Sequence, residues 1–393
     1  MKKVIIIVIM LSFAVLNNTY SQNVDSDSTK TEQTSLFKDS VDGKLDMSKW
    51  LLKEGGFFPL VQIVTEPSLG GIGILFLPIF IQKNEPVSKG EYAPPNLTVG
   101  AASYTANNTW ALGAMRIVHN QKYGINYRYG AAYADINMDF YRVLPHLGEK
   151  KFSFNFQTVP IYGNILKEFG DSHFYAGVEW IFAKTKVNPV FDINNPTIDD
   201  FLNKILNEKD IESTISSFGT ILQYDTRDNL FTPNKGFYAE LDLRFNDKWT
   251  GSDYKFQNAH LVMFKYFHFT EKWVSSYRLD AEFLFGDDTP FYVHPGINLR
   301  GVPMARYQGL EAYTIETEQR YDFNLRWSGV VFGGLAKAVD AKTNFNDALL
   351  VHNYGAGFRY LISRIFGIRL GVDVAKSNND WGYYITFGSA WKR

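Results

Sequence analysis

The chain has 393 residues, with 40 lysine and arginine residues against 41 aspartate and glutamate residues, a formal net charge of −1. This balance, without any basic run, argues against a nucleic-acid partner held by bulk charge. The absence of cysteine excludes disulfides, thiolate metal sites and a cysteine nucleophile. Aromatic residues make up 16% of the chain, which suits strands and the interfacial aromatic belts of membrane barrels.

The first residues have the pattern of a signal peptide. Lys2 and Lys3 precede an apolar stretch over residues 4–16, which is followed by Thr19-Tyr20-Ser21. We expect residues 1–21 to direct export and cleavage to follow Ser21. Because no cysteine follows the apolar stretch, a diacyl-cysteine lipoprotein is excluded.

Residues 22–56 are rich in Ser, Thr, Asp and Lys, so we expect a mobile periplasmic N-terminal segment. After residue 21 no apolar run reaches the roughly 20 residues that a membrane helix needs. The longest run, residues 72–81, also contains Gly73 and Pro78. A membrane-spanning chain of this kind must therefore cross with strands.

From residue 57 onward, strand-length segments alternate polar and apolar side chains. Residues 237–245 and 273–285 are the clearest cases, with apolar side chains on one face and charged side chains on the other. Several segments exceed the usual strand length of about 5–6 residues and reach the 9–11 of transmembrane strands. A soluble sandwich also alternates, but the signal peptide and the length and number of strands favour an all-β fold, a transmembrane antiparallel β-barrel over residues 57–393. The expected lumen-lining residues are Glu240, Asp242, Arg244, Arg278, Asp280 and Glu282.

The segments add up to roughly fifteen strands, whereas a bacterial barrel of this kind needs an even number, so we expect about 16. Two places could hold the missing strand. Residues 123–143 change their apolar phase near residues 132–134, as a turn or a bulge would produce. The alternative is a short strand over residues 57–64.

One segment has the period of a helix. Residues 197–206 carry apolar side chains at 198, 201, 202, 205 and 206, and Thr197 and Asp200 are spaced like a capping box. We expect a short amphipathic helix on the extracellular side. It either covers the barrel or packs on a neighbouring loop, and the second interpretation is favoured because amphipathicity reports only the burial of one face.

Two local motifs add a family resemblance. Residues 223–237 contain a turn motif formed by Asp225, Arg227, Asp228, Pro233 and Gly236, and residues 298–303 contain Leu299-Arg300-Gly301. In order and spacing they resemble the bacterial surface antigen (BamA/TamA) superfamily of outer-membrane barrels, although Val302 replaces the usual aromatic residue. The resemblance implies a long loop folded into the lumen and five strands after it.

The resemblance also implies that Arg300 meets carboxylates of the barrel wall. Glu318-Gln319-Arg320 matches the family's E-x-R strand, but Phe332-Gly333-Gly334 has glycine where the next strand should carry aspartate. Glu318 is then the principal expected partner of Arg300, because a guanidinium in a partly desolvated lumen needs a carboxylate. We favour a structural brace formed by Arg300, Gly301 and Glu318 over a moving switch, and a self-satisfied turn for the 225–236 motif.

The family's insertion machines carry periplasmic POTRA domains, and this sequence has no room for one ahead of the barrel, so it resembles a POTRA-lacking branch. The resemblance implies a protein of the bacterial outer membrane that assists insertion or translocation of proteins or lipids. Its expected partners are outer-membrane lipids and a periplasmic protein. A weak seam between the first and last strands would serve this role, so we expect few hydrogen bonds between residues near 71–80 and residues near 383–391.

Two other functions remain open. A passive channel or purely structural barrel would also use a lumen of mixed charge. An enzyme is least favoured, because the sequence has no G-x-S-x-G motif and its seven histidines show no close pairing for a metal. We therefore expect no catalytic residues, no metal and no cofactor.

Overall fold

The computed structural model describes residues 36–53, 55–86, 92–144, 148–190, 211–341 and 343–391. The chain divides into Met1–Ser35 and one compact unit, Leu36–Arg393. The expected signal peptide and the expected helix over residues 197–206 lie outside the described residues.

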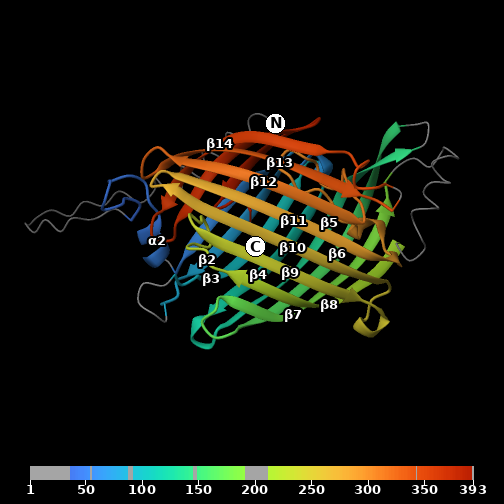
Figure 1. The fold of residues 1–393 in the computed structure, drawn as a ribbon, viewed down its shortest axis with the longest axis horizontal. Coiled ribbons are helices and arrows are strands. Elements are labelled where there is room, and N and C mark those ends of the chain that lie inside the picture. The colour runs from blue at the N-terminus through green and yellow to red at the C-terminus, as the bar shows by residue number, and fades with distance from the viewer. Residues whose placement is uncertain are drawn as a thin grey trace, which may run out of the picture. The chain divides into compact units, whose positions relative to one another are not determined.

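The compact unit is one 16-stranded antiparallel sheet whose strands follow each other in chain order (Figure 1). The strands are β1 Phe57–Val64, β2 Gly73–Gln82, β3 Asn96–Thr105, β4 Trp110–Asn120, β5 Ile125–Leu144, β6 Gly148–Glu168, β7 Phe174–Pro189, β8 Glu212–Asp225, β9 Gly236–Asn246, β10 Lys255–Thr270, β11 Trp273–Asp288, β12 Glu311–Asp322, β13 Trp327–Val339, β14 Val351–Ser363, β15 Ile368–Ser377 and β16 Trp381–Phe387. The helical elements are α2 Ser48–Lys53, η1 Pro67–Leu69, η2 Gln121–Tyr123, η3 Lys248–Thr250 and η4 Phe291–Val293. The sheet curls into a nearly closed barrel, so the predicted fold class and strand number are confirmed.

The missing strand is the short one at residues 57–64. Residues 123–143 do not divide, because β5 runs unbroken and keeps one register with β6 on both sides of Ala132 and Tyr133. The prediction of a turn or bulge there is wrong. The pairing of β5 with β6 is interrupted at these two residues, because Pro160 of β6, which faces Ala132, has no N–H to donate.

The barrel has two unlike rims. β1 begins and β16 ends at the same rim, which we call the terminal rim; the β4–β5 and β10–β11 connections there are short. The opposite rim, which we call the loop rim, carries the long connection between β11 and β12. In outer-membrane barrels, short turns face the periplasm and long loops face outward, so the terminal rim is the periplasmic one.

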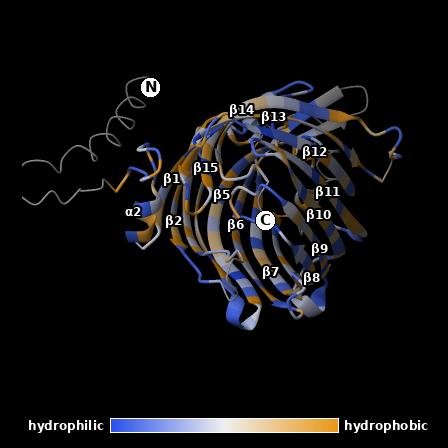
Figure 2. Cartoon of the chain, turned by 60° about the vertical axis from the view of Figure 1, so that its left-hand side comes forward, coloured by the Kyte–Doolittle hydropathy of each residue, from blue (hydrophilic) through white to orange (hydrophobic). Residues whose placement is uncertain are grey.

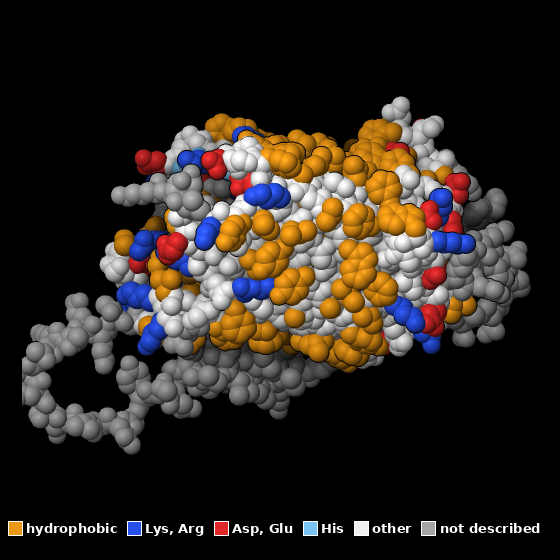
Figure 3. Space-filling view, turned by 90° about the horizontal axis from the view of Figure 1, so that it is seen from below, with side chains coloured by type: hydrophobic (Ala, Val, Ile, Leu, Met, Phe, Trp, Pro, Cys, Tyr) orange, Lys and Arg blue, Asp and Glu red, His pale blue; other side chains and the backbone are white. Residues whose placement is uncertain are grey.

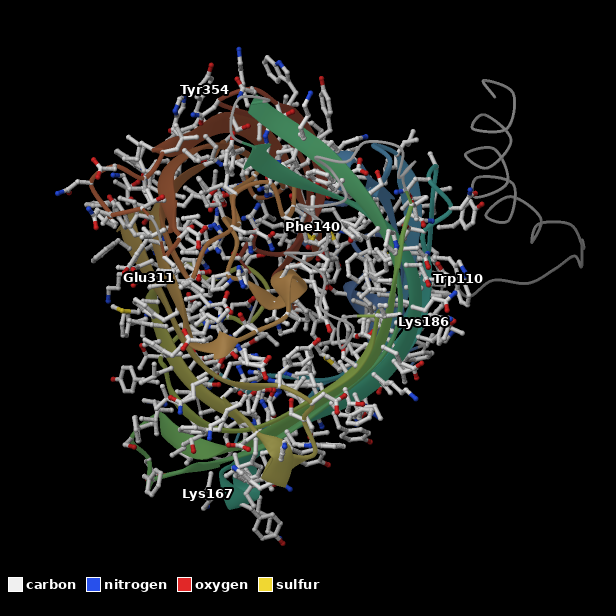
Figure 4. All side chains as sticks on the ribbon, turned by 90° about the vertical axis from the view of Figure 1, so that its right-hand side faces the viewer. Trp110, Phe140, Lys167, Lys186, Glu311 and Tyr354 are labelled. Carbon is white, nitrogen blue, oxygen red and sulfur yellow. The ribbon has the colours of Figure 1, made fainter. Side chains whose placement is uncertain are left out.

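Side chains alternate between the two faces of the wall, as the hydropathy colours along the strands show in Figure 2. Large apolar side chains cover the outer face, while charged side chains gather toward the rims (Figure 3). Viewed into the barrel, Phe140 points into the lumen, whereas Trp110 and Tyr354 point away from it (Figure 4). This apolar outer surface is what a lipid-facing wall requires.

No helix in the described parts of the chain is long and apolar enough to cross a membrane.

Residues 36–53, which we call the N-terminal clasp, bind to the terminal rim. Arg326 of the β12–β13 turn is buried and donates to Asp39, Asp42 and Asp46 at 2.5, 2.7 and 2.6 Å. Arg364 of the β14–β15 turn also donates to Asp39, at 2.7 Å. We expected a mobile segment from its polar composition, but its aspartates meet two arginines that sequence proximity could not reveal.

The clasp ion pairs perturb the titration of two carboxyl groups. Hydrogen bonds from Arg364 hold the pKa of Asp39 well below its usual range, and hydrogen bonds from Arg326 lower the pKa of Asp42. Both shifts mean that Asp39 and Asp42 pair with the two arginines as ionised carboxylates in the folded protein.

Apolar side chains cluster inside the barrel near the terminal rim. Leu51 of the clasp, strands β1 to β3, Phe231 of the β8–β9 turn, the β14–β15 hairpin and Phe387 of β16 contribute to one buried cluster. Ser389 N donates to Phe231 O at 2.5 Å, so the β8–β9 turn reaches across the barrel to the end of β16. The β8–β9 turn therefore lies across this end of the lumen.

Candidate functional site

The β11–β12 loop folds back into the barrel, as expected. Its two arms pair at Gly296 and Gln308, with Ile297 N donating to Tyr307 O at 3.0 Å. Leu299 and Val302 are buried at its tip and pack in one cluster with β13 and β14 side chains. This apolar packing places Arg300 inside the barrel.

Arg300 binds three carboxylates of the barrel wall. Its guanidinium donates to Glu318 at 2.7 Å, Asp373 at 2.9 Å and Glu316 at 3.1 Å. The guanidinium carbon also lies 3.4 Å from the centroid of the Phe332 ring. A cation enclosed by three acids and a ring face is strongly held, because desolvation strengthens each charged contact.

Sequence reasoning named Glu318 but missed Glu316 and Asp373. Glu316 lies two residues before Glu318 on the same inward face of β12, so strand alternation alone could have suggested it. Asp373 comes from β15, and its position opposite Arg300 depends on barrel register. The glycine at 334, where the family pattern has aspartate, leaves room for the loop: a Cβ there would lie 2.9 Å from Leu299 Cδ2.

The backbone of the tip is also held. Gly301 has a φ of +86°, and its backbone N–H donates a hydrogen bond to the Tyr384 hydroxyl at 2.6 Å. Its carbonyl accepts from Ser377 Oγ at 2.7 Å, and a Cβ at this position would approach Ser377 N to 3.2 Å. Glycine is needed at 301 for both the left-handed backbone and this close approach.

The residues of the turn motif form hydrogen bonds mainly with one another and with the backbone of the same turn. Arg227 donates to Asp225 through Nε at 2.9 Å and Nη2 at 2.7 Å, and its guanidinium lies over the Tyr238 ring. Asp228 accepts from the backbone of Asn234 at 2.9 Å and of Lys235 at 3.2 Å. At Gly236, with φ +114°, a Cβ would lie 2.3 Å from Thr226 O. The geometry is that of a rigid turn between β8 and β9, which contains Pro233.

The six expected lumen-lining residues all lie on the inward faces of β9 and β11, opposite exposed residues such as Phe245 and Leu279. Arg278 pairs with Asp280 at 2.5 Å and approaches Glu316 at 3.6 Å, so it joins the Arg300 site. Arg244 lies 3.9 Å from Glu282. Tyr238 donates to Glu240 at 2.5 Å, and Asp242 is buried on the same face.

The first and last strands do not form a ladder. Among the described residues, β1 pairs only with β2 and β16 only with β15. Side chains join the two edges instead: Gln62 Nε2 donates to Ile385 O at 2.8 Å, and Thr65 Oγ1 contacts the backbone of Tyr383. Pro59 in β1 has no N–H, which is tolerated at an edge strand. The expected weak seam is present, but its first strand is β1 rather than residues 71–80.

The chain leaves the wall after Phe387 and turns into the lumen. Trp391 is buried against Tyr238, Phe264 and other side chains of β9 and β10. Its indole Nε1 donates to Glu316 at 2.6 Å, the carboxylate that also binds Arg300. The final strand was expected to reach residue 391, whereas Gly388, with φ +74°, redirects the chain.

The loop also contacts both sides of the seam at the loop rim. Met304 N donates to Glu66, just after β1, at 2.9 Å, and Arg306 pairs with Asp380, just before β16. At the terminal rim, the clasp leads into β1 and binds the β14–β15 turn on the other side. The seam is therefore bridged at its ends and sparsely bonded between them.

Among the described residues, no group of three His, Asp or Glu side chains is placed to hold a metal ion.

Residues 100–294 match the Omp85 superfamily domain. This part of the chain is an Omp85 superfamily domain. The resemblance to BamA/TamA barrels that the two motifs predicted is thus confirmed, and the fold indicates a bacterial outer-membrane protein. No curated protein matches the chain in sequence.

Three solved structures share the fold at low identity. BamA from Haemophilus ducreyi lacking POTRA domains 1–3 is 14% identical with a TM-score of 0.54, over 96% of this chain and 76% of that one. CdiB from Acinetobacter baumannii is 11% identical with a TM-score of 0.52, and CdiB from Escherichia coli is 9% identical with a TM-score of 0.56. The match covers 84% of this chain in both, but only 59% and 61% of the two CdiB chains.

Proposed function

We propose that this Omp85 barrel assists the insertion or translocation of proteins, or of lipids, at the outer membrane, together with a periplasmic partner. The observation that carries the proposal is the seam between β1 and β16. Each edge strand has unpaired backbone groups, and such an edge can template an incoming strand.

The arrangement around the seam supports a gate that opens. Few contacts join Gln62 and Thr65 to β16, so separating the edges breaks few hydrogen bonds. The loop, by contrast, binds Glu66 on one side and Asp380 on the other. In this proposal the Arg300 brace holds the loop in place, and the loop limits how far the seam separates.

The proposal is tested by locking the seam. Counting from the Thr65–Tyr383 contact, Ile63 and Ile385 face each other on the outward side, and the chain has no native cysteine to interfere. In cells whose only copy of the protein carries Ile63→Cys and Ile385→Cys, oxidation should lower the amounts of client proteins in the outer membrane. A reductant should restore them. Quantitative proteomics of outer-membrane fractions measures the effect.

The matched control is Val178→Cys/Thr220→Cys, which links two residues that already pair across β7 and β8. Oxidising this pair should change nothing. An unchanged outer-membrane protein profile in the oxidised seam variant would count against insertion through the seam.

The periplasmic partner in this proposal would bind the terminal rim, where the clasp and the short turns lie. Affinity purification from cross-linked native membranes should yield a stoichiometric periplasmic protein, and its recovery should fall when Asp39→Asn and Asp42→Asn loosen the clasp. A chain that purifies without any such protein would contradict this part.

A further inference from the structure

The outward face of β10 to β14 carries a groove that lies away from the seam, although its lining also includes Arg278 and Glu316 of the Arg300 site. Two rows of paired side chains cross this face. The row nearer the loop rim consists of Met263, Leu279, Ile315, Leu335 and His352. The row nearer the terminal rim consists of Lys265, Tyr277, Thr317, Gly333 and Tyr354.

The groove lies where the second row becomes small. Thr317 and Gly333 stand between Tyr277 and Tyr354, and a groove of about 600 Å³ opens there with a mainly apolar lining. We call it the Gly333 groove. These strands face the viewer in Figure 1.

Gly333 is not required by crowding of the backbone. A Cβ at this position would meet only Asn353 O, at an ordinary 3.4 Å, whereas a Cβ at Gly334 would lie 2.7 Å from Ile315 O. A glycine inside a strand weakens it, and commonly marks a close approach by a ligand or another chain. The open space above Gly333 can therefore accommodate a ligand or another chain.

Lys265 supplies a charge at the edge of the groove. Its ammonium lies 5.2 Å from the Phe267 ring centroid and 5.9 Å from that of Phe237. Within the described residues no carboxylate forms an ion pair with it. A lysine on a lipid-facing wall is costly unless its ammonium reaches a polar or anionic group.

Lys265 lies on the hydrocarbon side of the periplasmic interface, near enough for its side chain to reach lipid headgroups. It lies five residues before Thr270, the end of β10, which is about 13 Å along the membrane normal at the usual rise and tilt. Between it and the rim, exposed aromatic side chains form an interfacial belt: Phe267, Phe269, Trp273, Tyr321, Phe323 and Trp327. The flexible lysine stem can carry its charge toward that belt.

We propose that the Gly333 groove binds one glycerophospholipid of the periplasmic leaflet, with an acyl chain over Gly333 and the headgroup phosphate at Lys265. The apolar lining and the missing side chain at 333 accommodate the chain. The unpaired ammonium complements the phosphate. This site lies on the wall away from β1 and β16, so it is independent of the proposed seam function.

Native mass spectrometry of the full chain in detergent, with palmitoyl-oleoyl phosphatidylglycerol added, tests the site. The wild type should retain one lipid. Gly333→Leu fills the groove and should abolish retention, while Lys265→Gln should lower it about fivefold, the effect of one lysine–headgroup contact. Diacylglycerol, which has no phosphate, should bind equally to the wild type and to Lys265→Gln.

Two variants serve as matched controls. Gly163→Leu adds the same side chain on the outward face of β6, where a Cβ would meet only Arg128 O at 4.0 Å. Lys376→Gln removes a lysine that also lies over an aromatic ring, that of Trp381. Neither should change lipid retention.

A diazirine-bearing phospholipid gives a readout on the wild-type chain alone, and its cross-links should map to peptides of β10 to β14. Cross-links spread evenly around the barrel, or equal retention in all variants, would overturn the proposal. Preferential retention of lipid A would overturn the assignment to the periplasmic leaflet.

Discussion

Arg300 shares its three carboxylates with Arg278 and Arg359, so its removal affects several charged groups at once. Arg300→Ala leaves Glu316, Glu318 and Asp373 buried with less compensation, and we expect a loss of about 3 kcal/mol in the free energy of unfolding. The midpoint of heat-modifiable migration on gels measures the change. The stability of Arg300→Lys should fall between those of the wild type and Arg300→Ala, because lysine keeps the charge but lacks the planar guanidinium.

Arg116→Ala is the control for this prediction. Arg116 donates to the neutral Thr98 and Gln82, so its loss should cost about 1 kcal/mol or less. If Arg300→Ala were no more destabilising than Arg116→Ala, the brace would contribute little to holding the loop.

The same site shows which contacts a sequence can reveal. Glu318 was predictable because the E-x-R pattern resembles a known family. Asp373 was not, since its approach to Arg300 depends on how β15 is staggered against β12 around the barrel, and no local pattern encodes that stagger. Trp391 was expected in the last strand, and only the turn at Gly388 brings its indole to Glu316.

At the scale of elements, the N-terminal clasp should release in acid. The pKa of Asp39 and that of Asp42 are lowered in the folded protein. Their contribution is therefore complete above the ordinary carboxyl pKa of 3.8, declines below that pH, and is lost only as the pH falls through the lower pKa of each group in the folded protein. A spin label on Val41→Cys, an exposed clasp position, should be restrained at pH 6 and become mobile only well below pH 3.

Asp39→Asn should make the same label mobile already at pH 6, because Arg326 and Arg364 both lose their shared carboxylate. A label on Ile315→Cys in β12 should respond to neither change. If Asp39→Asn left the clasp label restrained at pH 6, apolar packing and the bond from Met47 N to Ile362 O, rather than the ion pairs, would hold the segment.

Strand alternation predicted some elements well and others poorly. β9 and β11 separate apolar from charged residues cleanly, because one face meets lipid and the other meets a polar lumen. In β5 the alternation of apolar and polar residues does not separate the two faces, because near the loop rim Phe140 and its neighbours pack against Phe291 of the loop. Apolar side chains there face the lumen, and the simple rule fails.

At the scale of the whole molecule, the filled lumen predicts a closed barrel. The loop tip, the C-terminal residues through Trp391 and the cluster at the terminal rim occupy the interior. In planar bilayers the wild type should therefore show no large, steady conductance, whereas deletion of residues 298–304 should produce frequent openings. A wild type that conducts steadily would favour the passive channel instead.

The strands that border the seam are also the short ones. β1 has 8 residues and β16 has 7, against 16 in β10. At the usual rise and tilt, 8 residues span about 20 Å, less than the apolar band of about 25 Å that a barrel presents to the bilayer. This hydrophobic mismatch forces the adjoining lipids to tilt or compress, so the bilayer is thinnest where the sheet is unpaired.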